Sequence, residues 1–236
     1  MKKGMVFISV VIVISLLFIG NTGALAGGFS FVNISWDDTP EQVFEKMSKS
    51  GLCSEFSKLK YYYGKECDNT FATLLYHRMI DQNMHKSLGD RTRLSSDQDR
   101  KLGPINKLRD MEIDGKNDSI VKKAVFFFTC DHKLLSYALD LRTAFSGDEI
   151  ETGEGNFYRS LVEKYGSPST TLKHAKKWTD NGQSLYYFYV NTTDVACLLY
   201  LSNKNIEEQI AKIQKIKGKF EKKGSSKEAG VVKKMF

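Results

Sequence analysis

The chain has 236 residues, of which 41% are hydrophobic and 27% are charged, and its formal net charge is +7. This length allows one large domain or two small ones. Residues 212–236 hold nine Lys and two Glu, a net charge of +7. When that segment (+7) and Lys2 and Lys3 (+2) are subtracted from the total of +7, residues 27–211 carry −2. The basic character belongs to the carboxyl-terminal end, which excludes a general affinity of the body for nucleic acid.

The amino terminus has the pattern of a secretory signal peptide. Lys2 and Lys3 precede an apolar run from Met5 to Ile19, and Ala24-Leu25-Ala26 follows as a cleavage site. The alternative is an uncleaved anchor, but the run is short for a spanning helix. We expect cleavage after Ala26, which would leave 210 of the 236 residues in the periplasm or outside the cell. No cysteine follows the site, so no lipid anchor is expected.

Four cysteines in an exported chain favour disulfide bonds, and four cysteines allow three connectivities. Cys53 and Cys67 are close in sequence, and Cys130 and Cys197 lie in two predicted strands of one sheet. We therefore favour the pairs Cys53–Cys67 and Cys130–Cys197. The alternative is four buried thiols.

The mature chain opens with weak alternation over 29–35, which predicts a first strand. A helix follows, because Thr39 is a good N-cap, Pro40 suits the first helical position and Gln42 completes a capping box. Val43, Phe44 and Met47 are predicted to form its buried face, and Gly51 is predicted to end the helix.

Residues 52–107 give no clear choice, since 71–79 suits a helix or a strand and 81–103 is mostly polar. A three-strand meander is predicted next, over 110–113, 121–130 and 134–142. In the last of these strands, Leu135, Tyr137, Leu139 and Leu141 alternate with polar or small residues, the period of a strand with one buried face.

A second group of elements begins with a helix of about ten residues after Asn156, the predicted N-cap. Gly166 and Pro168 end this helix. Apolar runs over 185–190 and 195–202 predict a hairpin. A last helix is predicted from Asn205 to about Phe220, with isoleucines at spacings of three and four.

These elements predict an α+β fold in which hairpins form an antiparallel sheet with helices packed on one face. Two related modules could divide the chain, an N-terminal one over 27–145 and a helix–hairpin–helix module over 146–220. Residues 221–236 are then predicted to be a disordered basic tail.

Two short motifs resemble known exported proteins. Trp36-x-x-Thr39-Pro40-Glu41-x-Val43 is similar to the opening of many small exported bacterial proteins of uncharacterised function. Leu161-x-x-Lys164-Tyr165-Gly166-x-Pro168, followed by Trp178 and two strands, resembles the outer-membrane assembly lipoprotein family BamE/SmpA. The likeness covers about 60 residues, and it implies a shared α+β layout and a non-catalytic role in the envelope.

The sequence contains only weak matches to the motifs of known metal-binding and catalytic sites. Asp110-x-Glu112-x-Asp114-Gly115 resembles the start of a calcium loop, but position twelve is Val121 in place of a bidentate Glu. The acidic loop of 148–154 lacks a metal-ligand spacing. The four histidines follow no zinc pattern, and no phosphate-binding loop or nucleophile elbow is present. We therefore predict no metal, no cofactor and no catalytic residue, with a hydrolase that uses His132 or His174 as the alternative.

Two surfaces are candidates for binding. Alternate residues of a strand face opposite sides of the sheet. If one side is open, its aromatic side chains could contact a partner, and we favour Tyr187, Tyr189 and Phe127 for this role. The alternative is a sheet covered on both faces. The last helix carries five lysines, which could bind an anionic membrane, or could form the solvated face of a docked helix: Lys212, Lys215, Lys219, Lys222 and Lys223. We predict a protein that binds another envelope protein or the envelope surface, with a membrane binder as an alternative. The sequence leaves the oligomeric state open.

Overall fold

A computed structural model describes residues 28–52, 108–142, 155–172, 175–190 and 195–235, and side chains are described except in 189–195 and beyond 219. The predicted signal peptide, the region 53–107 and the acidic loop lie outside these ranges. The described elements alternate between three helices and two groups of strands: α2 (Pro40–Lys49), β1 (Leu108–Asp114), β2 (Val121–Thr129), β3 (Leu134–Arg142), α7 (Asn156–Tyr165), β4 (Thr170–Leu172), β5 (Ala175–Asp180), β6 (Gln183–Val190), β7 (Val195–Ser202) and α8 (Asn203–Met235).

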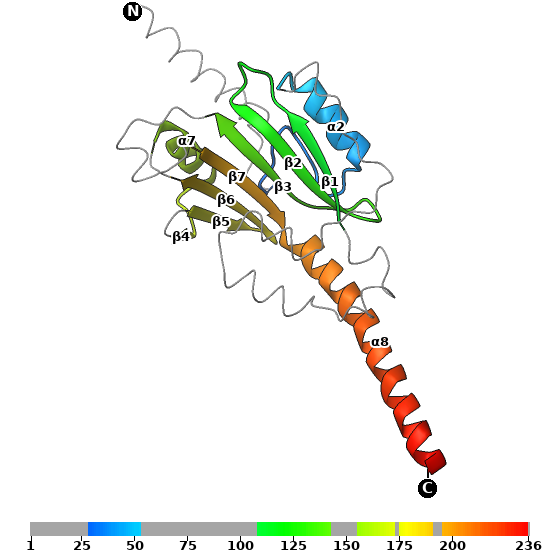
Figure 1. The fold of residues 1–236 in the computed structure, drawn as a ribbon. Helices are drawn as coiled ribbons and strands as arrows, with labels where there is room; N and C mark the ends of the chain where they lie inside the picture. The colour runs from blue at the N-terminus through cyan, green and yellow to red at the C-terminus, as the bar shows by residue number, and fades with distance from the viewer. Residues whose placement is uncertain (1–27, 53–107, 143–154, 173–174, 191–194, 236) are drawn as a thin grey trace, which may run out of the picture.

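All seven strands form one antiparallel sheet in the order β1-β2-β3-β7-β6-β5-β4 (Figure 1). Strands β3 and β7 pair at its centre, where Tyr137 lies opposite Tyr200. The pairing joins strands that the sequence assigned to two modules. The mixed class of helices with an antiparallel sheet is thus confirmed, but the sheet is larger than the predicted hairpins.

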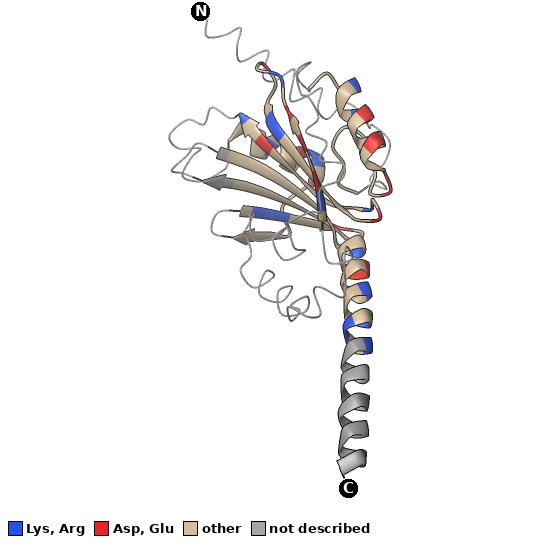
Figure 2. Cartoon of the chain, turned by 45° about the vertical axis from the view of Figure 1, so that its right-hand side comes forward, with Lys and Arg blue, Asp and Glu red and all other residues tan. Residues whose placement is uncertain are grey.

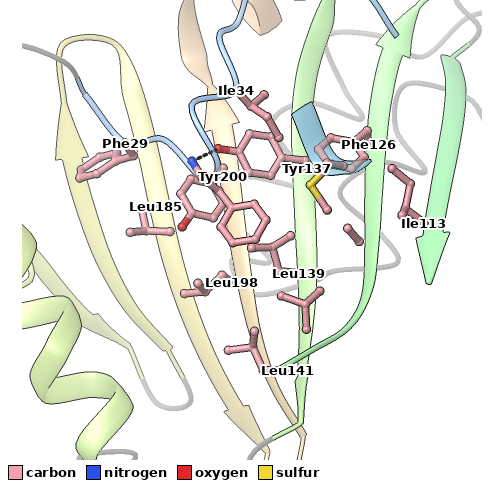
Figure 3. Close-up of a cluster of buried hydrophobic side chains, with 14 of the residues drawn as sticks. Phe29, Ile34, Ile113, Phe126, Tyr137, Leu139, Leu141, Leu185, Leu198 and Tyr200 are labelled. Atoms are coloured by element: carbon pink, nitrogen blue, oxygen red, sulfur yellow. Dashed lines mark hydrogen bonds between the residues drawn. The ribbon is translucent and has the colours of Figure 1, made fainter. Parts of the chain in front are cut away.

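One face of the sheet holds the larger apolar cluster. Every second residue of the strands enters it, with Phe126, Tyr137 and Tyr200 near its centre (Figure 3). The rings of Tyr137 and Tyr200 stack with centroids 4.5 Å apart. Helices and the N-terminal segment close this face through Phe29, Phe31, Ile34, Val43, Met47, Phe157 and Leu161.

The opposite face holds a second cluster, which contains Phe127, Tyr186 and Leu199 from alternate strand positions. Ile206 and Ile210 of α8 join it. The helices therefore contact both faces, and the prediction that they pack on one face is wrong. Continuous apolar runs such as Phe126-Phe127-Phe128 suit a strand that is buried on both sides.

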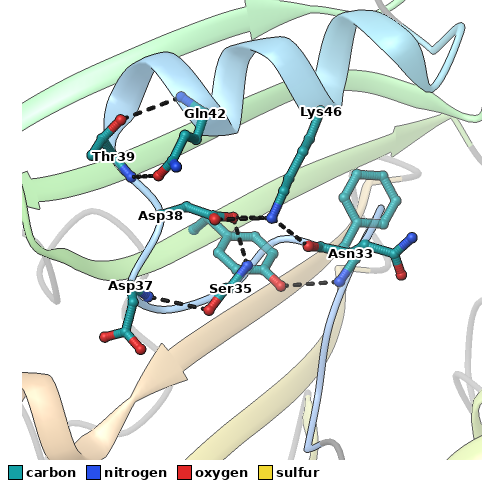
Figure 4. Close-up of polar contacts among 9 residues, drawn as sticks. Asn33, Ser35, Asp37, Asp38, Thr39, Gln42 and Lys46 are labelled. Atoms are coloured by element: carbon teal, nitrogen blue, oxygen red, sulfur yellow. Dashed lines mark hydrogen bonds and ion pairs between the residues drawn. The ribbon is translucent and has the colours of Figure 1, made fainter.

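The segment 29–35 is not the predicted strand, because it turns. Ile34 donates its backbone N–H to the carbonyl of Phe31 across Val32 and Asn33, which have φ of 51° and 58°. The segment then ends in a polar clasp: Lys46 of α2 contacts Asp38 at 2.6 Å and donates to the carbonyl of Asn33 at 2.8 Å (Figure 4). These contacts fasten the N-terminal segment to α2.

Several helix ends follow the sequence closely. The capping box of Thr39 and Gln42 is present, and Gly166 ends α7 with a φ of 76°. Two predictions were shifted. The N-cap of α7 is Gly155 and not Asn156. Helix α8 begins at Asn203, with the Ser202 hydroxyl accepting from the N–H of Asn205, and its helical backbone continues to Met235.

Candidate binding surfaces

The aromatic sheet face is not open in the structure. Tyr187 is 0% exposed and belongs to the larger cluster, where its ring lies 5.7 Å from that of Phe157. Phe127 is 9% exposed and lies on the other face. The side chain of Tyr189 lies outside the described part. The expected exposure of Tyr187 and Phe127 was therefore wrong, because apolar groups cover both faces of the sheet.

The apolar side of α8 fixes its first three turns to the body. Ile206, Ile210 and Ile213 are buried at spacings of four and three. Asn205 is also buried, and its amide donates to the carbonyls of Leu134 at 2.8 Å and Trp36 at 3.3 Å. The sequence suggested Asn205 as a helix cap, but its amide instead joins α8 to β3 and to the N-terminal segment. The signal in the sequence that could have indicated this buried role was the position of Asn205 among the isoleucines of the helix.

Two ion pairs tie α8 to the turn between β2 and β3. Lys133 pairs with Glu208, and Lys212 contacts Asp131 at 3.0 Å. The Lys133 ammonium lowers the pKa of Glu208. A hydrogen bond from the Thr129 hydroxyl, followed by the contact with Lys212, lowers the pKa of Asp131. Each exposed pair adds little stability, but the two together fix the side of α8 that faces the turn.

Beyond Ile213 the helix leaves the end of the sheet and projects away from the body (Figures 1 and 2). We call Lys212, Lys215, Lys219, Lys222 and Lys223 the lysine stripe. Residues three or four apart lie on one side of a helix. Lys215 and Lys219 are exposed and Lys212 keeps 49% of its side chain exposed, whereas the side chains of Lys222 and Lys223 lie outside the described part. The helical backbone that carries the stripe extends through all five positions.

His132 lies in the turn between β2 and β3 with a φ of 66° and is half-buried. Its Nε2 lies 3.0 Å from Nη1 of Arg109. Because a guanidinium can only donate, Nε2 is the acceptor in this contact. The neighbouring Asp131 is held by Thr129 and Lys212. His174 lies outside the described residues.

The acidic motif that resembled a calcium loop forms an edge strand. Asp110, Glu112 and Asp114 lie in β1, and Glu112 pairs with Lys123 of β2 at 2.8 Å. In the described part of the chain, no group of three or more His, Cys, Asp or Glu side chains could hold a metal ion.

The predicted disulfide between Cys130 and Cys197 is wrong. Cys197 lies opposite Asp140, which lies opposite Lys123, whereas Cys130 follows the last residue of β2. Seven residues of strand therefore separate the two cysteines along the sheet, roughly 23 Å at the rise of a strand. A disulfide requires Cα atoms within about 7 Å. Cys53 and Cys67 lie outside the described residues, so their pairing stays a prediction.

Buried phenols at the centre of the sheet are structural groups. Tyr137 accepts the backbone N–H of Phe31 at 3.2 Å (Figure 3). Burial raises the pKa of Tyr137 and of Tyr200 well above the usual value, and burial also raises the pKa of Tyr165. These tyrosines stay protonated at neutral pH, and their rings pack with the core.

No described helix has an apolar stretch that could span a membrane. Comparisons with protein families, curated proteins and solved structures find no match for this chain.

Proposed function

We propose that this is an exported, non-catalytic binding protein that attaches to another envelope protein or to the envelope surface through the outer face of α8. In this proposal, export follows from the signal-peptide pattern, and the envelope role agrees with the resemblance of the Tyr165-Gly166-x-Pro168 motif to the BamE/SmpA family. The two-module organisation likewise stays a prediction.

One observation carries the proposal: α8 is anchored at its base and then projects with exposed lysines. The anchor combines buried isoleucines with the amide of Asn205. A helix that served only to close the sheet would need no turns beyond Ile213, yet the helical backbone continues to Met235. The projecting part places positive charge away from the nearly neutral body, where a partner can approach it from several sides.

The charge of the projecting part is the property to test. A crosslinking pull-down from the native envelope would compare the chain from Gly27 to Phe236 with a variant that ends at Gly218. This variant keeps the anchor isoleucines and loses six lysines: Lys219, Lys222, Lys223, Lys227, Lys233 and Lys234. A full-length variant with those six lysines changed to Gln separates charge from length.

The proposal expects a stoichiometric partner or envelope fraction with the unaltered chain and its loss with both variants. Loss with the truncated chain alone would indicate that helix length matters and charge does not. A partner retained by both variants would move the site to the body, and no partner with any form would end the proposal. Substitution of Lys49 and Lys122 by Gln, two exposed lysines of the body, is the control for loss of lysine charge outside α8.

A further inference from the structure

The cations of α8 are of one kind. Between Asn203 and Met235 the helix contains ten Lys, four Glu and no Arg. Arginine offers a planar fork that recognises a single carboxylate or phosphate with defined geometry, whereas lysine is a hydrated point charge on a flexible stem. A helix that relies on lysine alone suits an extended anionic surface better than a shaped acidic pocket.

The lysine stripe is also linear. At 1.5 Å per residue, Lys212 and Lys223 are separated by about 16 Å along the axis. Lys215 and Lys219 are exposed, and the helical period places them on the side opposite to Ile206 and Ile210, which join the second apolar cluster. Lys212 contacts Asp131 of the turn between β2 and β3. Figure 2 shows lysines along the described part of α8 as it leaves the sheet. The stripe therefore presents a row of charges rather than a compact cluster.

The body supplies little competing attraction. Residues 27–211 carry −2 in total, and the +7 of residues 212–236 lies in the projecting helix and its last residue. Several cations of the body have acidic partners, such as Lys123 with Glu112 and Lys46 with Asp38. An anionic bilayer attracts a juxtaposed lysine enough to raise the affinity about fivefold for each residue. Several lysines in one row give a useful affinity without a membrane-spanning segment.

From this arrangement we infer that the lysine stripe binds the phosphate headgroups of an anionic phospholipid bilayer. The inference rests on the proposed function, and it names the surface that α8 engages. The bilayer is favoured over an acidic protein because arginine is absent and because the charges follow a line. Lys215 and Lys219 make the central contacts, while Lys212 remains within reach of Asp131.

The test measures co-sedimentation of the chain from Gly27 to Phe236 with vesicles. This chain contains every described residue and lacks the apolar amino terminus, which would itself bind lipid. One set of vesicles contains phosphatidylcholine alone, and the other contains phosphatidylcholine mixed with phosphatidylglycerol. The test variant is Lys215→Gln with Lys219→Gln, and the control is Lys49→Gln with Lys122→Gln. All four side chains are exposed, so neither pair should disturb folding, which circular dichroism would check.

The inference expects binding to the anionic vesicles only, with an affinity that falls as salt rises. The test variant should bind roughly 30-fold more weakly, since two lysines are removed, and the control should bind like the unaltered chain. Free glycerol phosphate at the same lipid phosphate concentration should not compete, because it offers no surface.

Absence of vesicle binding, equal loss in both variants or full competition by glycerol phosphate would overturn the inference. If the chain does not bind the vesicles but the envelope pull-down still depends on the lysine stripe, the partner is an acidic protein and the proposed function stands. If both measurements fail, the proposed function fails as well.

Discussion

The sheet and the outer part of α8 differ in the contacts that hold them in place. In the sheet, alternate residues enter one of two apolar clusters, and the body is held by contacts between distant segments. After Ile213, α8 extends from the body as a single helix on which Lys215 and Lys219 are exposed. An isolated helix gains little stability from propensity alone, so helices in proteins usually persist by packing an apolar face. The difference teaches that stability resides in the sheet and its covers, whereas the outer part of α8 is the segment that we propose for binding.

Alkaline pH should separate the two regions most strongly. Burial raises the pKa of Tyr137 and Tyr200, while unfolded tyrosine ionises near pH 10. Above that pH the unfolded chain has lost protons that the folded chain keeps, so the free energy of unfolding falls. Each of the two tyrosines should contribute about 1.4 kcal/mol for every pH unit above about 10. Urea unfolding across this range measures the slope.

The variant Tyr137→Phe is the control for this slope. It should be less stable at neutral pH, because the N–H of Phe31 loses its acceptor. Its stability should nevertheless fall less steeply with pH by the contribution of one tyrosine. A slope that does not change would mean that the phenol of Tyr137 ionises equally in both states.

Adding one methyl group in each region gives the next contrast. A Cβ built on Gly115 would overlap the backbone carbonyl of Val121, whereas a Cβ on Gly218 meets nothing within 4 Å. Gly115→Ala should therefore cost about 3 kcal/mol of unfolding free energy, because backbone must move. Gly218→Ala should stabilise the helix by roughly 0.5–1 kcal/mol. Chemical denaturation measures the first change, and amide exchange in α8 measures the second. Equal effects at the two sites would contradict the packing described for the turn at Gly115.

The junction between the two regions depends on Asn205. Asn205→Ala removes the donor that serves the carbonyls of Leu134 and Trp36. Leaving buried acceptors without this donor should cost about 2 kcal/mol. Amide exchange should speed up in the first turns of α8 while the sheet stays protected. Gln214→Ala, at an exposed position of the same helix, should change neither stability nor exchange. Loss of protection throughout the sheet would show that the junction is not a separate unit.

The smallest expected effect lies in the N-terminal segment. Val32 has a φ of 51°, which a β-branched residue rarely adopts. Asn tolerates this conformation, and it is common in turns with two positive φ angles. Val32→Asn should therefore stabilise the body by roughly 0.5–1 kcal/mol, with some loss because Val32 is partly buried against the core. Thermal unfolding measures the change, and Ser48→Asn on the exposed side of α2 serves as the control. A lower melting temperature would show that the packing of Val32 outweighs the strain of its backbone.

The sequence located most local elements well. The capping box of Thr39 and Gln42, Gly166 at the end of α7 and the span of β3 depend on neighbouring residues, so they can be predicted along the chain. The single buried face predicted for β3 was wrong, because its residues enter both apolar clusters. Strand β5 was missed because Lys176 and Lys177 interrupt its apolar pattern, and β4 was missed because it has only three residues, none of them buried. Lys176 is buried beside the ring of Tyr158, and Lys177 lies over that of Tyr186. Their ammonium groups lie over aromatic rings, an arrangement that depends on elements distant in sequence.

Some features of the candidate site could likewise be predicted from the sequence, and others could not. The lysine spacing of α8 was visible in the sequence because a helix has a fixed period. The burial of Tyr187, the separation of Cys130 from Cys197 and the anchoring role of Asn205 were not, because each depends on which strands are neighbours. Sequence alone determined the basic end, the capping box of α2, the glycine that ends α7 and the span of β3, which are local properties. Only the tertiary structure decided that β3 pairs with β7, that both sheet faces are covered and that α8 projects. Those outcomes arise from contacts between residues far apart in the chain. The free energies of such contacts cannot be predicted from a local sequence pattern.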